Sequence, residues 1–338
     1  MGRRRRVINV APALLVGLVA VVALPSCSGS DRLTVYSGRT ADLIGPLLEE
    51  FAEERDVGID VRYGDSGELA QLIDTEGDDS PADVFISQSP GAVAFLDQDE
   101  RLSPLSDGIL DAVEADDHAA DGHWVGLTAR VRVLVYNTDE VDPATLPESV
   151  FDLTDPQYRG LVGVAPPNGS FQDFVTAMRL DVGDDQTMAW LEAMAANEAV
   201  PYPNNVSIVE AVGRGEIRYG LVNHYYNERA QAEDPDVASE NYFFPEGDLG
   251  NLLLVTAASV VGTSDQTDVG EELIEFLLTA EPQEYFAGET KEYPLAAGVD
   301  PSGDLVPLAD LGVTRVPFDE LGDVARTEEL IDESGIEG

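Results

Sequence analysis

The sequence predicts an α/β fold of two lobes that a pair of long strands joins. From Arg32 onward, short β-branched runs alternate with amphipathic stretches, which is the pattern of a mostly parallel sheet covered by helices. The two longest strand-like runs, Arg130–Tyr136 and Leu252–Val261, bracket a central block with α/β elements of its own. This arrangement indicates two α/β domains joined by a two-stranded hinge, although pattern alone fits two core strands of one large sheet equally well.

The first elements of the chain follow this scheme. Three short strands rich in β-branched residues alternate with two helices whose apolar residues recur every three or four positions. In order, these predicted elements are the strand Leu33–Tyr36, the helix Thr40–Arg55, the strand Ile59–Tyr63, the helix around Leu69–Ile73 and the strand Ala82–Ile86. They form a β-α-β-α-β unit. Further helices are predicted near the end of the chain, around Glu271–Leu278 and Leu321–Ile331.

Length and composition allow two domains. With 338 residues, of which 43% are hydrophobic, the chain is long enough to bury a sizeable core and to form two domains of ordinary size. If the two long strands are the crossovers, the N-terminal lobe comprises residues 32–130 plus 258–338. The C-terminal lobe then comprises residues 131–257.

The N-terminal segment has the order of an export signal. The basic block Arg3–Arg6 precedes the apolar run Val7–Leu24, and small residues follow up to Cys27, the only cysteine of the chain. The four residues ending at Cys27 resemble a bacterial lipobox, so we expect a signal peptide over residues 1–26, a lipid on Cys27 and a tether over residues 27–31. The protein would then be exported and anchored to the outer face of the cell membrane. The alternative is a short membrane-spanning helix, because about 18 apolar residues is borderline for a span.

Charge and missing motifs exclude several classes of function. The formal net charge is −46, and so acidic a surface repels nucleic acid. The chain has one cysteine and three histidines, and it contains no G-x-S-x-G, H-E-x-x-H or P-loop motif. We expect a monomeric binding protein, not an enzyme. The competing hypothesis, a secreted enzyme that uses a tyrosine as acid or nucleophile, lacks a base at a suitable spacing.

Two adjacent tyrosines are the most unusual local feature. Tyr225 and Tyr226 end the buried-strand pattern Gly220–Tyr226, and the chain becomes helical over Asn227–Ala232. Neighbouring residues of a strand point to opposite faces, so both phenols converge only where the strand turns into the helix. Phenols titrate near pH ~10, and a hard trivalent cation such as Fe³⁺ is polarising enough to bind them as phenolates. The alternative is an aromatic patch in the core or at an interface, which is the commoner role of such a pair.

An ordered series of motifs supports the metal-binding hypothesis. The series is LTVYSGR from Leu33, SPADVFISQ from Ser80, RVRVLVYN from Arg130, LTDPQYRGLVGVAPPNGSF up to Phe171, YPNNVSIVEAVGRGEI from Tyr202, LVNHYYNERA from Leu221 and KEYPL from Lys291. From about Leu33 to the C-terminus, the chain resembles the ferric-ion-binding proteins of bacterial iron ABC transporters. The resemblance implies a type II periplasmic-binding-protein-like fold with two transferrin-like lobes. It also implies delivery of the ligand to an ABC transporter permease.

Carried over position by position, the resemblance implies a ligand set. Tyr225 and Tyr226 would hold Fe³⁺ as paired phenolates, and an anion such as carbonate or phosphate would fill the open coordination positions. The residues implied to line the anion pocket are Arg130, Asn168, Gly169, Ser170, Asn205 and Asn223. A helical stretch begins near Phe171, and helix N-termini bind anions readily. A simple loop with an N-cap explains the same residue types equally well.

The chain departs from the family pattern on the opposite lobe. Thr40 stands where members often have a histidine, Gln88 where they often have a glutamate, and Phe171 where some have a tyrosine. Arg39, Thr40 and Gln88 are therefore opposite-lobe candidates for an indirect or anion-holding role, and no anionic ligand is evident there. The runner-up hypothesis is the same fold with an iron chelate, an inorganic anion or a polyamine as its ligand. His224, beside the tyrosines, is expected to be structural.

Overall fold

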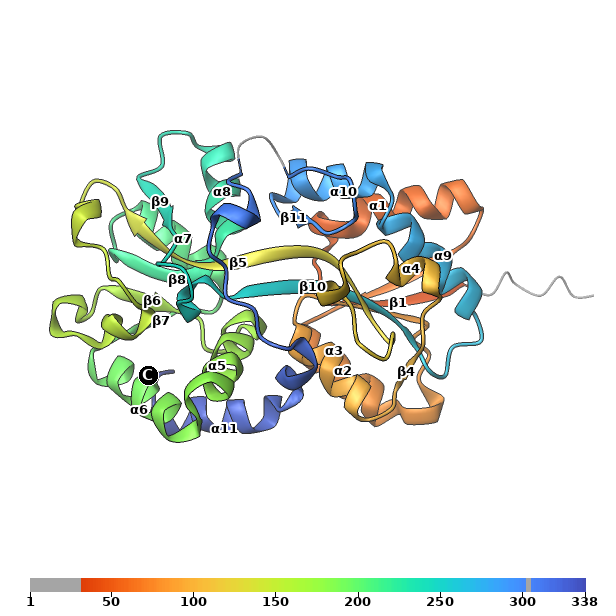
Figure 1. Ribbon diagram of the computed structural model, residues 1–338, viewed down its shortest axis with the longest axis horizontal. Coiled ribbons are helices and arrows are strands. Elements are labelled where there is room, and N and C mark those ends of the chain that lie inside the picture. The colour runs from red at the N-terminus through yellow and green to blue at the C-terminus, as the bar shows by residue number, and fades with distance from the viewer. Residues whose placement is uncertain (1–31, 302–304) are drawn as a thin grey trace, which may run out of the picture. The chain divides into compact units, whose positions relative to one another are not determined.

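The computed structural model describes residues 32–301 and 305–338, and residues 32–338 form one compact unit. The predicted signal peptide, Cys27 and the predicted tether lie outside the described residues. Helices flank a mixed sheet on both of its sides (Figure 1). Within residues 32–301 and 305–338, no helix combines the length and the apolar character needed to cross a bilayer.

The elements alternate in the order expected of an α/β chain. The strands are β1 (Leu33–Ser37), β2 (Ile59–Tyr63), β3 (Val84–Ser87), β4 (Leu102–Ser103), β5 (Val125–Asn137), β6 (Val162–Val164), β7 (Val200–Pro201), β8 (Tyr219–Asn223), β9 (Ser239–Tyr242), β10 (Leu253–Val261) and β11 (Tyr293–Pro294). The α-helices are α1 (Ala41–Arg55), α2 (Ser66–Glu76), α3 (Pro90–Gln98), α4 (Asp107–Leu110), α5 (Gly169–Val182), α6 (Asp184–Ala196), α7 (Asn205–Gly213), α8 (His224–Glu233), α9 (Thr267–Leu277), α10 (Ala280–Tyr285) and α11 (Val324–Ser334). The predicted β-α-β-α-β unit is therefore found as β1 to β3, with bounds shifted by a few residues.

Two long antiparallel strands connect two parallel groups of strands. The strand order is β2-β1-β3-β10-β5-β8-β6-β7, with β1 parallel to β2 and β3, and β6 parallel to β7 and β8. The strand β5 pairs with β10 from Val125 to Val131 and with β8 from Arg132 to Tyr136. Figure 1 shows β5 and β10 running between the two groups. We refer to the elements around β1–β3 as the first lobe and to those around β6–β8 as the second lobe.

Burial explains why the sequence of β5 is mostly apolar along its whole length, with two arginines in it. All 13 of its residues are buried, because the strand has neighbours on both edges and on both faces. In the second lobe, α7 lies so close to β8 that a Cβ atom at Gly220 would come within 2.1 Å of Ile208 Cγ2. Only glycine fits that position of the strand.

The last helix returns to the second lobe. Helix α11 packs against α5 and α6, as Figure 1 also shows. The predicted division assigns all of residues 258–338 to the first lobe, but α11 packs on two helices of the second lobe. The short 3₁₀ helix η9 (Phe318–Gly322), which precedes α11, packs against α3 of the first lobe. The C-terminal segment therefore contacts both lobes.

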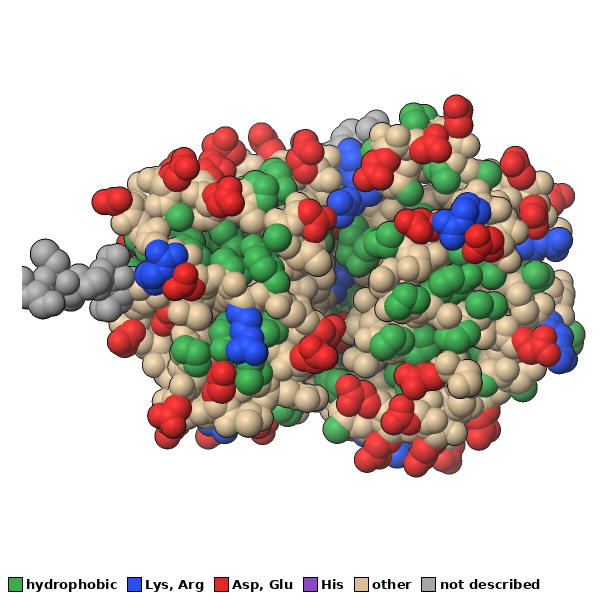
Figure 2. All heavy atoms as spheres, turned by 180° about the vertical axis from the view of Figure 1, so that it is seen from behind, with side chains coloured by type: hydrophobic (Ala, Val, Ile, Leu, Met, Phe, Trp, Pro, Cys, Tyr) green, Lys and Arg blue, Asp and Glu red, His purple; other side chains and the backbone are tan. Residues whose placement is uncertain are grey.

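Acidic side chains are spread over both lobes and do not gather in one patch on the face shown in Figure 2. The same view shows a furrow between the lobes with Lys or Arg side chains in it. The distribution matches a net charge of −46 carried as a solvated surface. Other Lys and Arg side chains are scattered over the outer surfaces of both lobes.

Candidate functional site

A small polar cavity lies between the two lobes. It encloses about 40 Å³, several times the ~10–15 Å³ that one water molecule needs. The first lobe contributes Gly38, Asp65, Ser66, Gln88 and Ser89 to its lining. The strand β5 and the second lobe contribute Arg130, Asn168, Gly169, Ser170, Asn223, Tyr225 and Tyr226. The cavity therefore has room for an ion and a few further atoms.

The tyrosine pair lies where the strand–helix junction places it. The strand β8 ends at Asn223 and α8 begins at His224, so Tyr225 and Tyr226 occupy the first helical turn. Their rings stack with centroids 4.2 Å apart and an interplanar angle of 29°, and both line the cavity. The two phenols therefore converge, which an uninterrupted strand would not allow.

Burial controls the protonation of Tyr225. Its side chain is 1% exposed, and this burial raises the pKa of Tyr225 well above 10, with Tyr226 and Glu292 acting in the same direction. The isolated protein therefore keeps this phenol protonated at neutral pH. A cation that binds it as a phenolate has to displace the proton.

Two arginines of β5 are buried at the site: Arg130 lines the cavity, and Arg132 lies behind residues that line it. Arg130 Nη1 donates to Thr256 Oγ1 at 3.3 Å, and Arg132 Nη1 donates to Ser170 Oγ at 3.2 Å and Asn223 Oδ1 at 3.3 Å. Among the described residues, Arg130 Nη2 and Arg132 Nε have no hydrogen-bond partner. Burial lowers the pKa of Arg132 to about 9, and the nearby charge of Arg130 acts in the same direction. Unpaired buried guanidinium groups favour an anion in the cavity.

Arg132 is a residue that the sequence interpretation missed. The sequence pattern could have identified it, because Arg130 and Arg132 are two positions apart in a strand and therefore share one face. An isolated arginine in a buried strand is already rare, and two on one face indicate a charged site.

The start of α5 carries most of the predicted anion pocket. Asn168 is the N-cap, and its Oδ1 accepts from Ser170 N at 3.2 Å and from Ser170 Oγ at 2.6 Å. Asn205 lies behind this loop, where its Nδ2 donates to Asn168 Oδ1 at 3.2 Å, and it does not line the cavity. Asn168, Gly169, Ser170 and Asn223 do line it. The helix begins at Gly169, two residues earlier than predicted.

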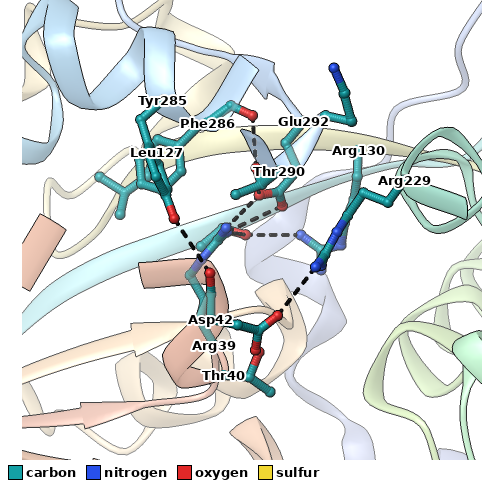
Figure 3. Close-up of polar contacts among 12 residues, drawn as sticks. Arg39, Thr40, Asp42, Leu127, Arg130, Arg229, Tyr285, Phe286, Thr290 and Glu292 are labelled. Atoms are coloured by element: carbon teal, nitrogen blue, oxygen red, sulfur yellow. Dashed lines mark hydrogen bonds and ion pairs between the residues drawn. The ribbon is translucent and has the colours of Figure 1, made fainter. Parts of the chain in front are cut away.

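Of the three opposite-lobe candidates, only Gln88 lines the cavity. Its Nε2 has no hydrogen-bond partner within the described residues. Arg39 instead turns into the core and forms a fully buried ion pair with Glu292, as Figure 3 shows. Thr40 is exposed, and its Oγ1 donates to Asp42 Oδ1.

The first lobe does place an acidic side chain at the cavity. Asp65 lines it and is the N-cap of α2, with Oδ1 accepting from Gly67 N at 2.8 Å and Glu68 N at 3.3 Å. The sequence interpretation found no anionic residue in this lobe because it compared only the positions of Thr40 and Gln88 with the family pattern. An N-cap aspartate is common, so Asp65 gave no distinct signal.

His224 is structural, as predicted, because it fixes the junction from which the tyrosines project. It is buried, its Nδ1 accepts from Val131 N at 3.2 Å, and its Nε2 donates to Lys291 O at 2.9 Å. Burial lowers the pKa of His224 to about 4. The imidazole is therefore neutral at physiological pH and connects the start of α8 to β5 and to the segment before β11.

Asp173 makes the stability of the protein depend on pH. Burial raises the pKa of Asp173 to about 7 and Asp65 adds to this, although Ser89, Arg130 and Gly91 act in the opposite direction. Because the folded pKa lies above that of the unfolded chain, the stabilising protonated form is lost as the pH rises through about 7. The free energy of unfolding is therefore expected to fall between pH ~4, the unfolded pKa, and about 7, by an amount on the order of 2–4 kcal/mol. Urea unfolding measures this fall, and an equal fall in Asp173→Asn would contradict its assignment to Asp173.

Two lobes that enclose a small polar cavity define a ligand-binding protein of the solute-capturing type. The family described as bacterial extracellular solute-binding protein matches residues 79–305, which is more than half of the chain. The chain belongs to this family. Its members are binding proteins of transport systems, which confirms the expectation that the protein is not an enzyme.

Characterised relatives cover almost the whole chain. The Fe(3+)-binding periplasmic protein of Serratia marcescens is 27% identical over 336 residues, which are 98% of this chain and 99% of that protein. The iron uptake protein A2 of Synechocystis sp. is 30% identical over 332 residues, 91% of this chain and 94% of that protein. The structure of iron-bound HitA from Pseudomonas aeruginosa superposes with a TM-score of 0.86 at 30% identity and covers 90% of this chain and 99% of HitA. The resemblance and the two-lobed α/β fold class predicted from the sequence are thereby confirmed.

Proposed function

We propose that this protein is the extracellular substrate-binding lipoprotein of an ABC importer and that it binds ferric ion with a synergistic anion between its lobes. The observation that carries the proposal is the stacked pair Tyr225 and Tyr226 on the wall of a small polar cavity. Hard oxygen donors of this kind suit Fe³⁺. The relatives described as iron-binding or iron uptake proteins support the same ligand.

The charges of the site support a bound anion. Fe³⁺ with two phenolates retains one positive charge, and the guanidinium groups of Arg130 and Arg132 are buried nearby. Carbonate or phosphate would neutralise this charge at the N-terminus of α5, between Asn168, Gly169 and Ser170, with Asn205 and Asn223 as supporting partners. Gln88 and Asp65 would complete the site from the first lobe, while Arg39 and Thr40 would act through the groups around them.

The size of the cavity argues for a small ligand. About 40 Å³ suits an ion with an anion of a few atoms and is small for an iron chelate. The buried guanidinium groups argue against a polyamine, because like charges repel. An inorganic anion without a metal remains the second candidate, since the same arginines would hold it.

Titration of the ligand-free protein with Fe³⁺ separates these possibilities. In the presence of carbonate or phosphate, we expect one equivalent of iron and a visible tyrosinate-to-iron absorption band. Without either anion, binding should be weaker. Tight phosphate binding by calorimetry with no colour on adding Fe³⁺ would favour the anion alone and reject the ferric proposal.

The bound ligand has to be delivered to the membrane permease. The two lobes, predicted as residues 32–130 plus 258–338 and residues 131–257, would close over the ligand. The closed form, a monomer, would then dock to the permease. A lipid on Cys27 would hold the exported protein at the outer face of the cell membrane. The mass of the mature N-terminus tests this anchoring, because an unmodified Cys27 would exclude it.

A further inference from the structure

Asp173 of α5 makes hydrogen bonds that cross from the second lobe to the first. Its Oδ1 accepts from Ser89 Oγ at 2.7 Å and from Gly91 N at 3.1 Å. Ser89 and Gly91 form the start of α3, and all three residues are buried. The carboxyl group thus lies at the N-terminus of a helix that belongs to the other lobe, where two donors of that helix meet one of its oxygens.

The contact is close enough to require glycine at its centre. A Cβ atom at Gly91 would lie 2.7 Å from Asp173 Oδ1 and 2.9 Å from Leu321 O. Either the carboxylate or the segment before α11 would have to move. The backbone of α3 therefore approaches Asp173 as closely as a residue without a side chain allows.

The residues just before α3 form part of the cavity lining. Gln88 and Ser89 both line it, and Gln88 N donates to Ser66 Oγ at 3.0 Å. The backbone from Gln88 to Gly91 is therefore held at one end by the first lobe and at the other end by Asp173. Separation of the lobes would break only the second of these attachments.

We propose that Asp173 is a closure latch, a positioning residue that holds the lobes together over the bound ligand and slows its release. The inference rests on the proposed function, in which ferric ion is enclosed between the lobes. When the lobes open, the Asp173 side chain separates from Ser89 Oγ and Gly91 N. Leaving a buried donor without its acceptor corresponds to about ten- to a hundredfold in an equilibrium or rate.

The test compares iron release from variants on both sides of the latch. The wild type, Asp173→Ala and Ser89→Ala are loaded with Fe³⁺ and carbonate, and loss of the visible band is followed after adding excess EDTA. We expect both variants to release iron about ten- to a hundredfold faster. Thr176→Val is the matched control, because Thr176 is buried on the same helix and its Oγ1 bonds to Thr327 on α11 without involving α3. It should release iron at close to the wild-type rate.

The double variant separates the latch from a direct effect of Ser89 on the ligand. Both substitutions remove one shared hydrogen bond, so the double variant should be no faster than the faster single variant. Additive effects, or wild-type rates in Asp173→Ala, would overturn the latch. Asp173→Asn keeps an acceptor and the volume, and its rate is expected to lie between those of the wild type and Asp173→Ala.

A measurement without iron keeps the latch distinct from the ferric proposal. Absence of colour in the wild type would reject the proposed function and leave the latch to be judged by small-angle X-ray scattering of the ligand-free proteins. A larger radius of gyration in Asp173→Ala and Ser89→Ala than in the wild type and Thr176→Val would support it. In a protein that binds no iron, equal radii would overturn it.

Discussion

Replacing Tyr225 and Tyr226 together by phenylalanine is expected to abolish the visible iron band and to weaken ferric binding by far more than about a hundredfold. Loss of even an outer partner of a metal ligand commonly weakens binding ten- to a hundredfold, and here two direct ligands are lost. The two rings would keep their stacking, because phenylalanine differs only by the hydroxyl oxygen. Competition for Fe³⁺ against citrate measures the affinity, and the absorption spectrum reports the tyrosinate bond.

Tyr219→Phe provides a matched control for this experiment. Tyr219 is a buried tyrosine at the other end of β8, where its ring packs edge-on against Tyr158. It does not line the cavity, so its variant should bind iron like the wild type. Thermal unfolding of each variant checks that the fold is intact. A double variant that keeps the colour would show that other residues hold the iron.

Replacing Glu292 by glutamine is expected to destabilise the protein by about 3–5 kcal/mol, because it leaves Arg39 as an unpaired buried charge. Both side chains of the pair are 0% exposed, and Glu292 Oε2 also accepts from Thr290 Oγ1 at 2.8 Å. Burial pushes the pKa of Glu292 upward, but Arg39 outweighs burial and holds the pKa below its usual value. The pair therefore stabilises the protein at neutral pH, and this contribution is lost as the pH falls through the folded pKa of Glu292.

Urea unfolding at neutral pH measures the effect of Glu292→Gln. The control is Glu198→Gln, which breaks an ion pair with Arg159 whose side chains are 60% and 58% exposed, and which should cost less than about 1 kcal/mol. Combining Arg39→Met with Glu292→Met should recover most of the stability, because no charge then remains buried. A loss for Glu292→Gln as small as that of Glu198→Gln would show that the buried pair contributes little.

Much of the site was predictable because its signals are local. The Tyr225–Tyr226 pair follows a strand pattern and precedes a helical one, so the sequence alone predicts the junction at which two neighbouring phenols converge. Asn168 and Ser170 similarly predict the start of α5, because they form a helix-capping sequence. Helix α5 begins two residues and α8 three residues earlier than predicted, so both tyrosines lie in the first turn of α8.

The side-chain direction of Arg39 shows where local patterns fail. Arg39 and Thr40 lie just after β1, next to Gly38 of the cavity lining, and the resemblance to ferric-ion-binding proteins made both of them site candidates. The guanidinium instead turns inward, because Glu292 lies in the core with Thr256 beside it. Glu292 is 253 residues away, and no pattern around Arg39 indicates that partner.

The sequence by itself determined the alternation of strands and helices, the two long strands and the tyrosine pair at a strand–helix junction, because each depends on residues close together in the chain. That the long strands connect two lobes was decided by their pairing in the sheet. Only the tertiary structure decided that Asp65 and Gln88 line the same cavity as the tyrosine pair, and that Asp173 accepts a hydrogen bond from Ser89 beside it. These residues come from separate elements of two lobes, and their distances depend on how the lobes pack against each other. Asp173 is the buried acid among them and is tolerated only in that packing, so nothing in its local sequence distinguishes it from an ordinary surface acid.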